Sequence, residues 1–363
     1  MKWSFKLGRF LGIDVYVHFT FVLLLGFLGL AHWLASRDLG RAIEGVLFFL
    51  SLFLCVLLHE YGHALMARRY GIATVDITLL PIGGLARLER LPAEPIKEFW
   101  IAVAGPAVNV IIALALAIGL TLGQQWQPLG TLSATDGHFA GRLLLVNVFL
   151  VLFNLIPAFP MDGGRVLRSL LAMKLGLPRA TAIAATLGQG IAFLFGFLGL
   201  FWNPMLIVIA FFVWIGASQE AGAVQMRSAL SGITVERAMI TDFKALTPTD
   251  SLARAVDLVL SGSQPDFPVV EGRRVVGVLT RTDLLGALAK GSPTAPVSSA
   301  MQRSFLAVDP REPVEEALQR GRAAVLPLMP VVENGLLIGL LTMENVSEFL
   351  LIQAAIHERR TTY

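Results

Sequence analysis

The chain of 363 residues is 55% hydrophobic and 15% charged, with a mean hydropathy of +0.69. This composition is too apolar for a soluble globular protein and predicts that most of the chain lies in a bilayer. The formal net charge of +3 is too small to indicate nucleic-acid binding. Its single cysteine, Cys55, lies in an apolar run, which excludes a disulfide framework and a cysteine-based metal cluster.

Six apolar runs are long enough to span, or nearly span, about 30 Å of hydrocarbon. They cover residues 15–36, 45–66, 99–122, 143–160, 181–201 and 203–219. The first run follows a basic start, but it is long and no A-x-A-type cleavage site closes it. We therefore expect a retained anchor rather than a signal peptide.

The basic residues predict the orientation of these spans. With the N-terminus in the cytoplasm, the inside segments are 1–14, 67–97 and 162–180, and the outside loops are 37–44, 123–142 and 202. The inside segments then carry 12 Lys and Arg, against 3 in the outside loops. The positive-inside rule therefore predicts a multi-pass cell-membrane protein with both termini in the cytoplasm.

His59, Glu60 and His63 lie near the end of the second run, in the sequence HEYGH. On a helix, residues four positions apart share one face, about 40° and about 6 Å from each other. This spacing lets two imidazoles bind one Zn²⁺, and it lets Glu60 reach a water on the metal. A packed polar cluster is the alternative, but three such groups without a partner are costly in a membrane. The motif predicts a zinc site with Glu60 as general base.

A third protein ligand is expected, because catalytic zinc has three such ligands and an open position for water. The candidate is Asp162 in FNLIPAFPMDGGRV, at the cytoplasmic end of the fourth run. Pro157 and Pro160 break the helix before it, and Gly163–Gly164 allows a tight turn. Irregular backbone at this depth is tolerated only where it lines protein or water. We expect Asp162 to complete the site; an ordinary interfacial turn solvated by Arg165 is the alternative.

The sequences HEYGH in one run and NLIPAFPMDGG in a later run resemble the site-2 protease family of intramembrane zinc metalloproteases. The resemblance implies that His59, His63 and Asp162 bind one zinc ion per chain and that Glu60 activates the water. It also implies that Asn154 holds the substrate or the oxyanion, a role that an amide donor suits. Interhelical hydrogen bonding is the alternative for Asn154.

The segment TVDITLLPIGGLARLERL, residues 74–91, lies between the second and third runs. Its β-prone start and Gly83–Gly84 predict a short re-entrant strand or hairpin whose free edge pairs with an unwound substrate. The family resemblance implies the same role for this Gly-Gly loop, and a plain surface hairpin is the alternative. Pro106 and Asn109, in AGPAVNV of the third run, match a family pattern that we interpret as helix packing.

Residues 233–356 contain an internal repeat of about sixty residues. FPVVEGRRVVGVLTRTDLLGAL is echoed by MPVVENGLLIGLLTMENVSEFL, a repeat that resembles tandem CBS domains. The family often binds adenine nucleotides, which implies ATP or AMP at Thr280 and Asp283 of the first repeat. The second repeat has Asn345 in place of the aspartate, so we expect at most one nucleotide. A dimerising or gating module without a ligand is the alternative.

The predicted fold is an α-helical polytopic membrane protein with six transmembrane helices and a small re-entrant β element, followed by a soluble α/β tandem CBS module. The predicted parts are a protease domain (1–220), a linker (221–232), two CBS domains (233–290 and 291–356) and a tail (357–363).

These features predict a zinc metalloendopeptidase that performs regulated intramembrane proteolysis under control of the cytoplasmic CBS pair. The family implies membrane-tethered substrates, such as anti-sigma factors, pro-sigma factors or signal-peptide remnants, and a homodimer formed through the CBS domains. The alternative is a CBS-gated transporter or channel. A transporter is expected to show broken helices at matching positions of two repeated halves, which this sequence lacks.

Overall fold

The structure is a computed structural model that describes residues 3–81, 83–90, 92, 94–124, 126, 138–262, 264–324 and 326–361. The chain folds into two compact units, residues 1–224 and 225–363. The segment 221–232, expected to be a linker, is helical as far as Leu230. Of the expected outside loop 123–142, residues 125 and 127–137 lie outside the described residues.

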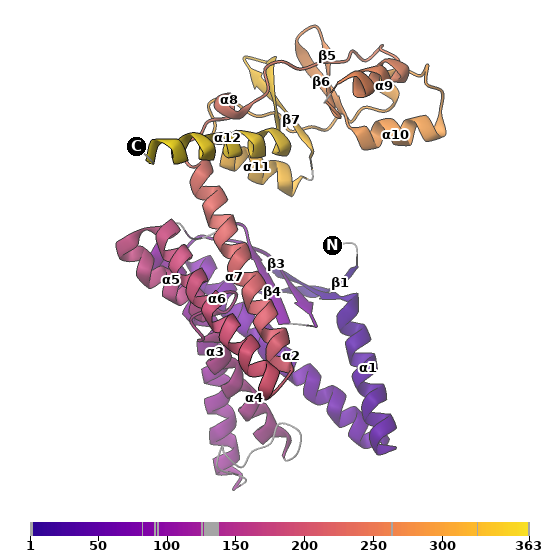
Figure 1. Ribbon diagram of the computed structural model, residues 1–363. Helices are drawn as coiled ribbons and strands as arrows, with labels where there is room; N and C mark the ends of the chain where they lie inside the picture. The colour runs from indigo at the N-terminus through magenta and orange to yellow at the C-terminus, as the bar shows by residue number, and fades with distance from the viewer. Residues whose placement is uncertain are drawn as a thin grey trace. The chain divides into compact units, whose positions relative to one another are not determined.

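Long apolar helices dominate the first unit (Figure 1). The helices that begin there are α1 (Phe19–Ser36), α2 (Leu39–Arg69), α3 (Pro95–Leu122), α4 (Phe139–Asn154), α5 (Asp162–Leu175), α6 (Leu177–Phe201) and α7 (Met205–Leu230). In the described part of the chain, five of them are long and apolar enough to cross a membrane, namely α1, α2, α3, α6 and α7. The polytopic helical fold is therefore confirmed, although the expected fourth span is the shorter, 16-residue α4.

Two of the predicted spans, the first and the fourth, extend beyond the end of their helix, and the structure shows a local reason for each. The first helix begins at Phe19 rather than at residue 15, because residues 13–18 form a strand. The imidazole of His18 caps this helix by accepting from the Thr20 N–H at 3.3 Å. Helix α4 ends at Asn154 rather than at residue 160, since the segment that follows contains Pro157 and Pro160.

The small β element expected over residues 74–91 is half of a four-stranded sheet. Its strands are β1 (Ser4–Phe10), β2 (Ile13–His18), β3 (Thr74–Leu80) and β4 (Gly83–Leu88), in that spatial order. The central pair β2–β3 is parallel, and both outer pairs are antiparallel. Within the described residues, β4 is hydrogen-bonded only to β3 and is therefore an edge strand. The sequence analysis missed β1 and β2, which it assigned to the cytoplasmic start and the first span.

The sheet packs against the part of α2 that carries the histidines. Ile13, Val15 and Ile77 of the sheet form a buried cluster with Tyr61 and Ala64 of α2. The Tyr61 hydroxyl also donates to the carbonyl of Phe10 at 3.0 Å. Because a helix turns by about 100° per residue, Tyr61 and Ala64 lie on the side of α2 roughly opposite to His59 and His63. The sheet thus holds α2 from the side away from these histidines.

The second unit contains two β-hairpins with helices on either side. Its elements are α8 (Val235–Ala238), α9 (Leu252–Ser261), β5 (Phe267–Glu271), β6 (Arg274–Leu279), α10 (Arg281–Lys290), η2 (Val297–Ser299), α11 (Val314–Ala323), β7 (Leu328–Glu333), β8 (Leu336–Thr342) and α12 (Met343–Thr361). Residues 291–296 lead into η2, and α12 extends through most of the expected tail; residues 362–363 lie outside the described residues.

Each repeat of this unit has its own core, completed by a segment from the other repeat. Val297, which begins the second repeat, is buried in the core of the first. Reciprocally, Val235 at the start of the first repeat is buried in the core of the second. A third cluster, which includes Val278 and Leu340, joins the two sheets. This exchange explains why the repeats form one module rather than two separable domains.

Candidate metal centre and active site

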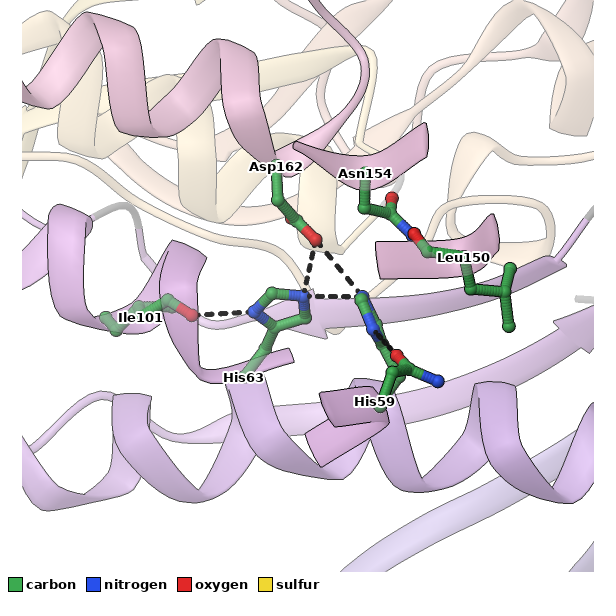
Figure 2. A network of polar contacts seen from close by, with 7 residues as sticks. His59, His63, Ile101, Leu150, Asn154 and Asp162 are labelled. Atoms are coloured by element: carbon green, nitrogen blue, oxygen red, sulfur yellow. Dashed lines mark hydrogen bonds and ion pairs between the residues drawn. The ribbon is translucent and has the colours of Figure 1, made fainter. Parts of the chain in front are cut away.

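His59 and His63 lie one helical turn apart on α2 and point toward Asp162, the first residue of α5 (Figure 2). The three side chains are buried, with residue exposures of 7%, 6% and 7%. The Nε2 atom of each histidine lies 3.1 Å from Asp162 Oδ2, and the two Nε2 atoms are 3.1 Å apart. The structure therefore brings together the two histidines of the HEYGH motif and the predicted aspartate, which lies about one hundred residues further along the chain.

This triangle of atoms fits a zinc ion. With zinc bonds of about 2.0–2.1 Å, the ligand atoms of a tetrahedral site lie about 3.3 Å apart, close to the 3.1 Å found here. Two imidazole nitrogens and one carboxylate oxygen are also ligands that zinc prefers. Three protein ligands leave the fourth position open, as catalytic sites require. The same three residues form the group that could hold a metal in the described part of the chain.

The backbone fixes the orientation of His63. Its Nδ1 donates to the carbonyl of Ile101 on α3 at 2.6 Å. A carbonyl only accepts, so the proton lies on Nδ1 and the lone pair on Nε2 faces the triangle. His59 makes a comparable contact, with its Nδ1 2.5 Å from Oδ1 of Asn109 on the same helix α3. Asn109, which the sequence analysis interpreted as a packing residue, thus contacts a predicted metal ligand.

Helix α3 approaches the imidazoles closely because two glycines lie in the contact. A Cβ added to Gly62 of α2 would lie 2.6 Å from the carbonyl oxygen of Ala104. A Cβ added to Gly105 of α3 would lie 2.2 Å from His63 Nε2 and 2.7 Å from His59 Nε2. Both distances are far below van der Waals contact. Gly105 therefore keeps free the space beside the Nε2 atoms of the two histidines.

The first turn of α5 presents Asp162. The free N–H groups at a helix N-terminus favour an anionic side chain there. Gly163 and Gly164 are helical, and their role is close packing rather than the tight turn that we expected. A Cβ on Gly163 would lie 2.3 Å from the Ile156 carbonyl oxygen, and one on Gly164 would lie 2.6 Å from the backbone of Ala158. The D-G-G sequence thus lets α5 begin directly against the proline-containing segment.

Glu60 lies between the metal-binding face of α2 and the face that packs on the sheet. Its side chain is half-buried and reaches the edge strand β4, where a Cβ on Gly84 would lie 2.5 Å from Glu60 Cγ and 3.1 Å from Oε1. The structure therefore places the predicted general base against the strand predicted to receive the substrate. Gly83, which starts β4, has φ +138°, a conformation that side chains rarely adopt.

The side chain of Asn154 lies beside Asp162 but is engaged elsewhere (Figure 2). Its Nδ2 donates to the Leu150 carbonyl of its own helix at 3.0 Å. One N–H of the amide is thus engaged within α4, and the NH₂ group carries a second donor for the predicted oxyanion role.

A buried ion cluster, missed by the sequence analysis, connects the metal-site helices. Arg168 on α5 is 3% exposed, and its guanidinium donates to Glu98 of α3 and to Glu220 of α7. Glu98 lies one turn before Ile101, whose carbonyl holds His63. The cluster therefore ties the helix that presents Asp162 to the helix that orients His63. Burial of one such charge without its partner costs several kcal/mol, about 3–5 in typical proteins.

The predicted nucleotide residues of the first repeat lie at the start of α10. Thr280 caps this helix, and its hydroxyl donates to Asp283 Oδ2 at 2.5 Å. The Gln302 amide donates to the same oxygen at 2.8 Å. Asp266 accepts from the Arg281 N–H at 2.8 Å. Burial raises the pKa of the Asp266 carboxyl, and the negative charge of Asp283 adds to that effect.

The second repeat uses the equivalent position differently. Asn345 occupies the position of the expected aspartate, and its Nδ2 donates to the Ala238 carbonyl at 2.5 Å. An aspartate could not donate to that carbonyl. The asparagine is therefore explained by a structural bond between the repeats.

The chain matches two family models. Peptidase family M50 matches residues 47–135 and 131–197, and the CBS domain model matches residues 235–290 and 297–352. These ranges contain the three candidate ligands, Glu60 and both repeats.

Three known proteins are similar to this chain. Zinc metalloprotease MJ0392 of Methanocaldococcus jannaschii is 35% identical over 282 residues, 77% of this chain and 78% of the relative. Stage IV sporulation protein FB of Bacillus subtilis is 31% identical over 132 residues, 36% of this chain and 42% of the relative. The solved site-2 protease from Methanocaldococcus jannaschii is 36% identical, with a TM-score of 0.45, and the match covers 60% of this chain and 95% of that one. The chain therefore belongs to peptidase family M50, the site-2 protease family of zinc metalloproteases, and carries a C-terminal pair of CBS domains.

Proposed function

We propose that this metalloprotease cleaves peptide bonds within or beside the transmembrane segments of membrane-tethered proteins. The observation that carries the proposal is the triangle formed by His59, His63 and Asp162. It lies among helices long enough to cross a membrane, and the carboxylate of Glu60 lies one residue from the first ligand. Ionisable groups at such positions are costly and are retained for function.

The proposed roles follow from the chemistry of each side chain. His59, His63 and Asp162 hold zinc, which when bound would act as a Lewis acid on the scissile carbonyl and on a water molecule. Glu60 takes the proton from the attacking water and passes it to the leaving amine. Its half-buried position beside β4 keeps the carboxylate close to a peptide bound on that strand.

Asn154 is proposed to stabilise the oxyanion. An amide N–H is a suitable donor for the negative charge that develops on the carbonyl oxygen. In the structure one N–H of this amide is bonded to Leu150, and the second N–H would donate to the oxyanion.

The edge strand β4 is proposed to bind the substrate backbone. A helical transmembrane segment must unwind before its peptide bonds become accessible, and an edge strand offers unpaired backbone groups to the extended chain. Gly83 and Gly84 begin this strand, and Gly84 lies against Glu60. Pairing along β4 would therefore bring an extended peptide next to the general base.

Replacing Gly84 with alanine tests this placement. The new methyl group would displace Glu60, because its Cβ would lie 2.5 Å from Glu60 Cγ. We expect kcat to fall by about 10-fold to 100-fold with zinc retained, since small misplacements of a catalytic group have effects of this size. The control is Gly26→Ala on α1, where nothing lies within 4 Å of an added Cβ. An unchanged kcat in Gly84→Ala would contradict the placement of Glu60 against β4.

The CBS pair is proposed to regulate cleavage by binding one adenine nucleotide, ATP or AMP. Asp283 would accept from the ribose hydroxyls, while Thr280 and the first N–H groups of α10 would face phosphate. The second repeat lacks this arrangement because Asn345 is bonded to Ala238. One nucleotide per CBS pair is therefore the expected stoichiometry.

Asp283→Ala should weaken nucleotide binding by about 10-fold or more, because hydrogen bonds to a charged group contribute about 1.5–3 kcal/mol. Titration calorimetry of the full chain with AMP and with ATP measures the change. The control is Asp257→Ala, which removes an exposed carboxylate from α9 of the same repeat. Equal affinities of wild type and Asp283→Ala would refute this nucleotide site, and the protease proposal would be unaffected.

The cellular setting is also proposed. The excess of basic residues in the inside segments supports a plasma-membrane protein with cytoplasmic termini. Membership of the site-2 protease family supports a membrane-tethered protein substrate, such as a pro-sigma factor, an anti-sigma factor or a signal-peptide remnant. The CBS pair supports a homodimer.

The test of the proposed function is cleavage of a tagged transmembrane peptide by the purified protein in detergent. Product should form with wild type and disappear when zinc is removed with a chelator. Cleavage that persists in the metal-free protein would contradict the proposal.

A further inference from the structure

A chain of buried amides runs from His59 on α2 through α3 to α4. His59 Nδ1 lies 2.5 Å from Asn109 Oδ1, and Asn109 Nδ2 donates to Asn147 Oδ1 at 2.9 Å. Asn147 Nδ2 donates to the Leu143 carbonyl at 2.9 Å and faces Cys55 Sγ at 3.4 Å. Both asparagines are 0% exposed, so water does not compete for these bonds.

The far end of this chain fixes the direction of every bond in it. The Leu143 carbonyl only accepts, so Asn147 must turn its NH₂ group toward Leu143 and its oxygen toward Asn109. Asn109 must then present its NH₂ group to Asn147 and its oxygen to His59. An oxygen opposite His59 Nδ1 requires the proton on Nδ1. The lone pair of the neutral ring then lies on Nε2, the atom that faces His63 and Asp162.

We propose that Asn147 is a positioning residue for zinc, which acts through Asn109 to hold His59 in its metal-binding tautomer. The inference rests on the proposed metal site. Partners of this kind fix the tautomer and the ring orientation of metal-binding histidines, and their loss typically weakens metal binding by about 10-fold to 100-fold. Asn147 has this effect from two hydrogen bonds away, on a helix that supplies no zinc ligand.

Asn147→Leu should weaken zinc binding by about 10-fold to 100-fold. Leucine has a similar size but accepts no hydrogen bond, so the NH₂ group of Asn109 loses the partner that sets its direction. The Asn109 amide is then free to turn its NH₂ group toward His59 Nδ1. This favours the tautomer with its lone pair on Nδ1 and its proton on Nε2, the nitrogen that would bind zinc. Zinc retained by the purified protein against increasing chelator concentrations measures the affinity.

A second substitution separates positioning from packing. Asn109→Asp puts two acceptor oxygens beside His59, so the direction of the group no longer matters. Alone, this change sets a carboxylate oxygen against Asn147 Oδ1 and should weaken zinc binding. Combined with Asn147→Leu, that repulsion is absent, and the double variant should bind zinc more tightly than either single variant. A purely structural role predicts instead that the two losses add.

The control is Leu144→Ala, which truncates a neighbouring residue of α4 that is 2% exposed. It should lower the unfolding temperature and leave zinc affinity unchanged. Unchanged zinc affinity in Asn147→Leu, or additive losses in the double variant, would overturn the inference, whereas a wild type without zinc would overturn the proposed metal site.

Where Asn147→Leu does not fold, nitrogen NMR of histidine-labelled wild type decides the question. After zinc removal, His59 should carry its proton on Nδ1, and a proton on Nε2 would overturn the inference.

Discussion

Replacing Glu60 with glutamine is expected to lower the rate of peptide cleavage by about 100-fold to 10,000-fold, the usual contribution of general acid–base catalysis. Glutamine has nearly the same shape but cannot take a proton from water. His59, His63 and Asp162 are unchanged, so the zinc content should stay the same as in wild type. Single-turnover cleavage of a tagged transmembrane peptide measures the rate, and metal analysis of the same preparation measures the zinc.

The cleavage rate and the zinc content together distinguish a general base from a zinc ligand. A slow variant that keeps its zinc supports the assignment of Glu60 as the proton acceptor. Loss of zinc from Glu60→Gln would mean that this carboxylate binds the metal. Full activity would mean that another group takes the proton.

Gly105→Ala is expected to abolish zinc binding, although alanine favours a helix over glycine by about 0.5–1 kcal/mol. The added methyl group would lie 2.2 Å from His63 Nε2 and 2.7 Å from His59 Nε2. The His63 ring has little freedom to move, because its Nδ1 is bonded to Ile101. Zinc affinity should fall by more than about 100-fold, which exceeds the typical effect of losing a hydrogen-bond partner of a metal ligand.

The matched control lies on the same helix. Gly119→Ala makes the same chemical change in α3 at a position where nothing lies within 4 Å of the added Cβ. It should keep zinc and activity, with stability equal to or above that of wild type. Equal zinc contents in Gly105→Ala and wild type would show that α3 does not border the metal site as described.

The sequence predicted which three side chains lie together, because each carried a signal in its local surroundings. His59 and His63 are four residues apart, and helical geometry alone places them on one face. Asp162 is an isolated acid after two prolines, where an apolar segment ends. The family resemblance joined these two sequences, and the structure places their donor atoms 3.1 Å apart.

The supporting residues were not predictable in the same way, since their roles depend on contacts between distant helices. Asn109 and Asn147 are isolated amides in apolar stretches of helix, a pattern equally typical of ordinary helix packing. Arg168 is one of four basic residues of an inside segment, where the positive-inside rule alone accounts for it. Strands β1 and β2 alternate weakly, and β2 runs directly into α1, so the pairing of β2 with β3 is a tertiary feature.

The central claim is that two imidazoles and one carboxylate of this chain bind zinc, and X-ray absorption at the zinc edge of the purified wild type tests it most directly. We expect about one zinc per chain. The spectrum should show nitrogen and oxygen ligands at about 2.0–2.1 Å and the outer scattering of two imidazole rings. A sulfur ligand at about 2.3 Å would implicate Cys55, the single cysteine of the sequence, and would contradict the account. Zinc without imidazole scattering, or protein that retains no zinc, would contradict it as well.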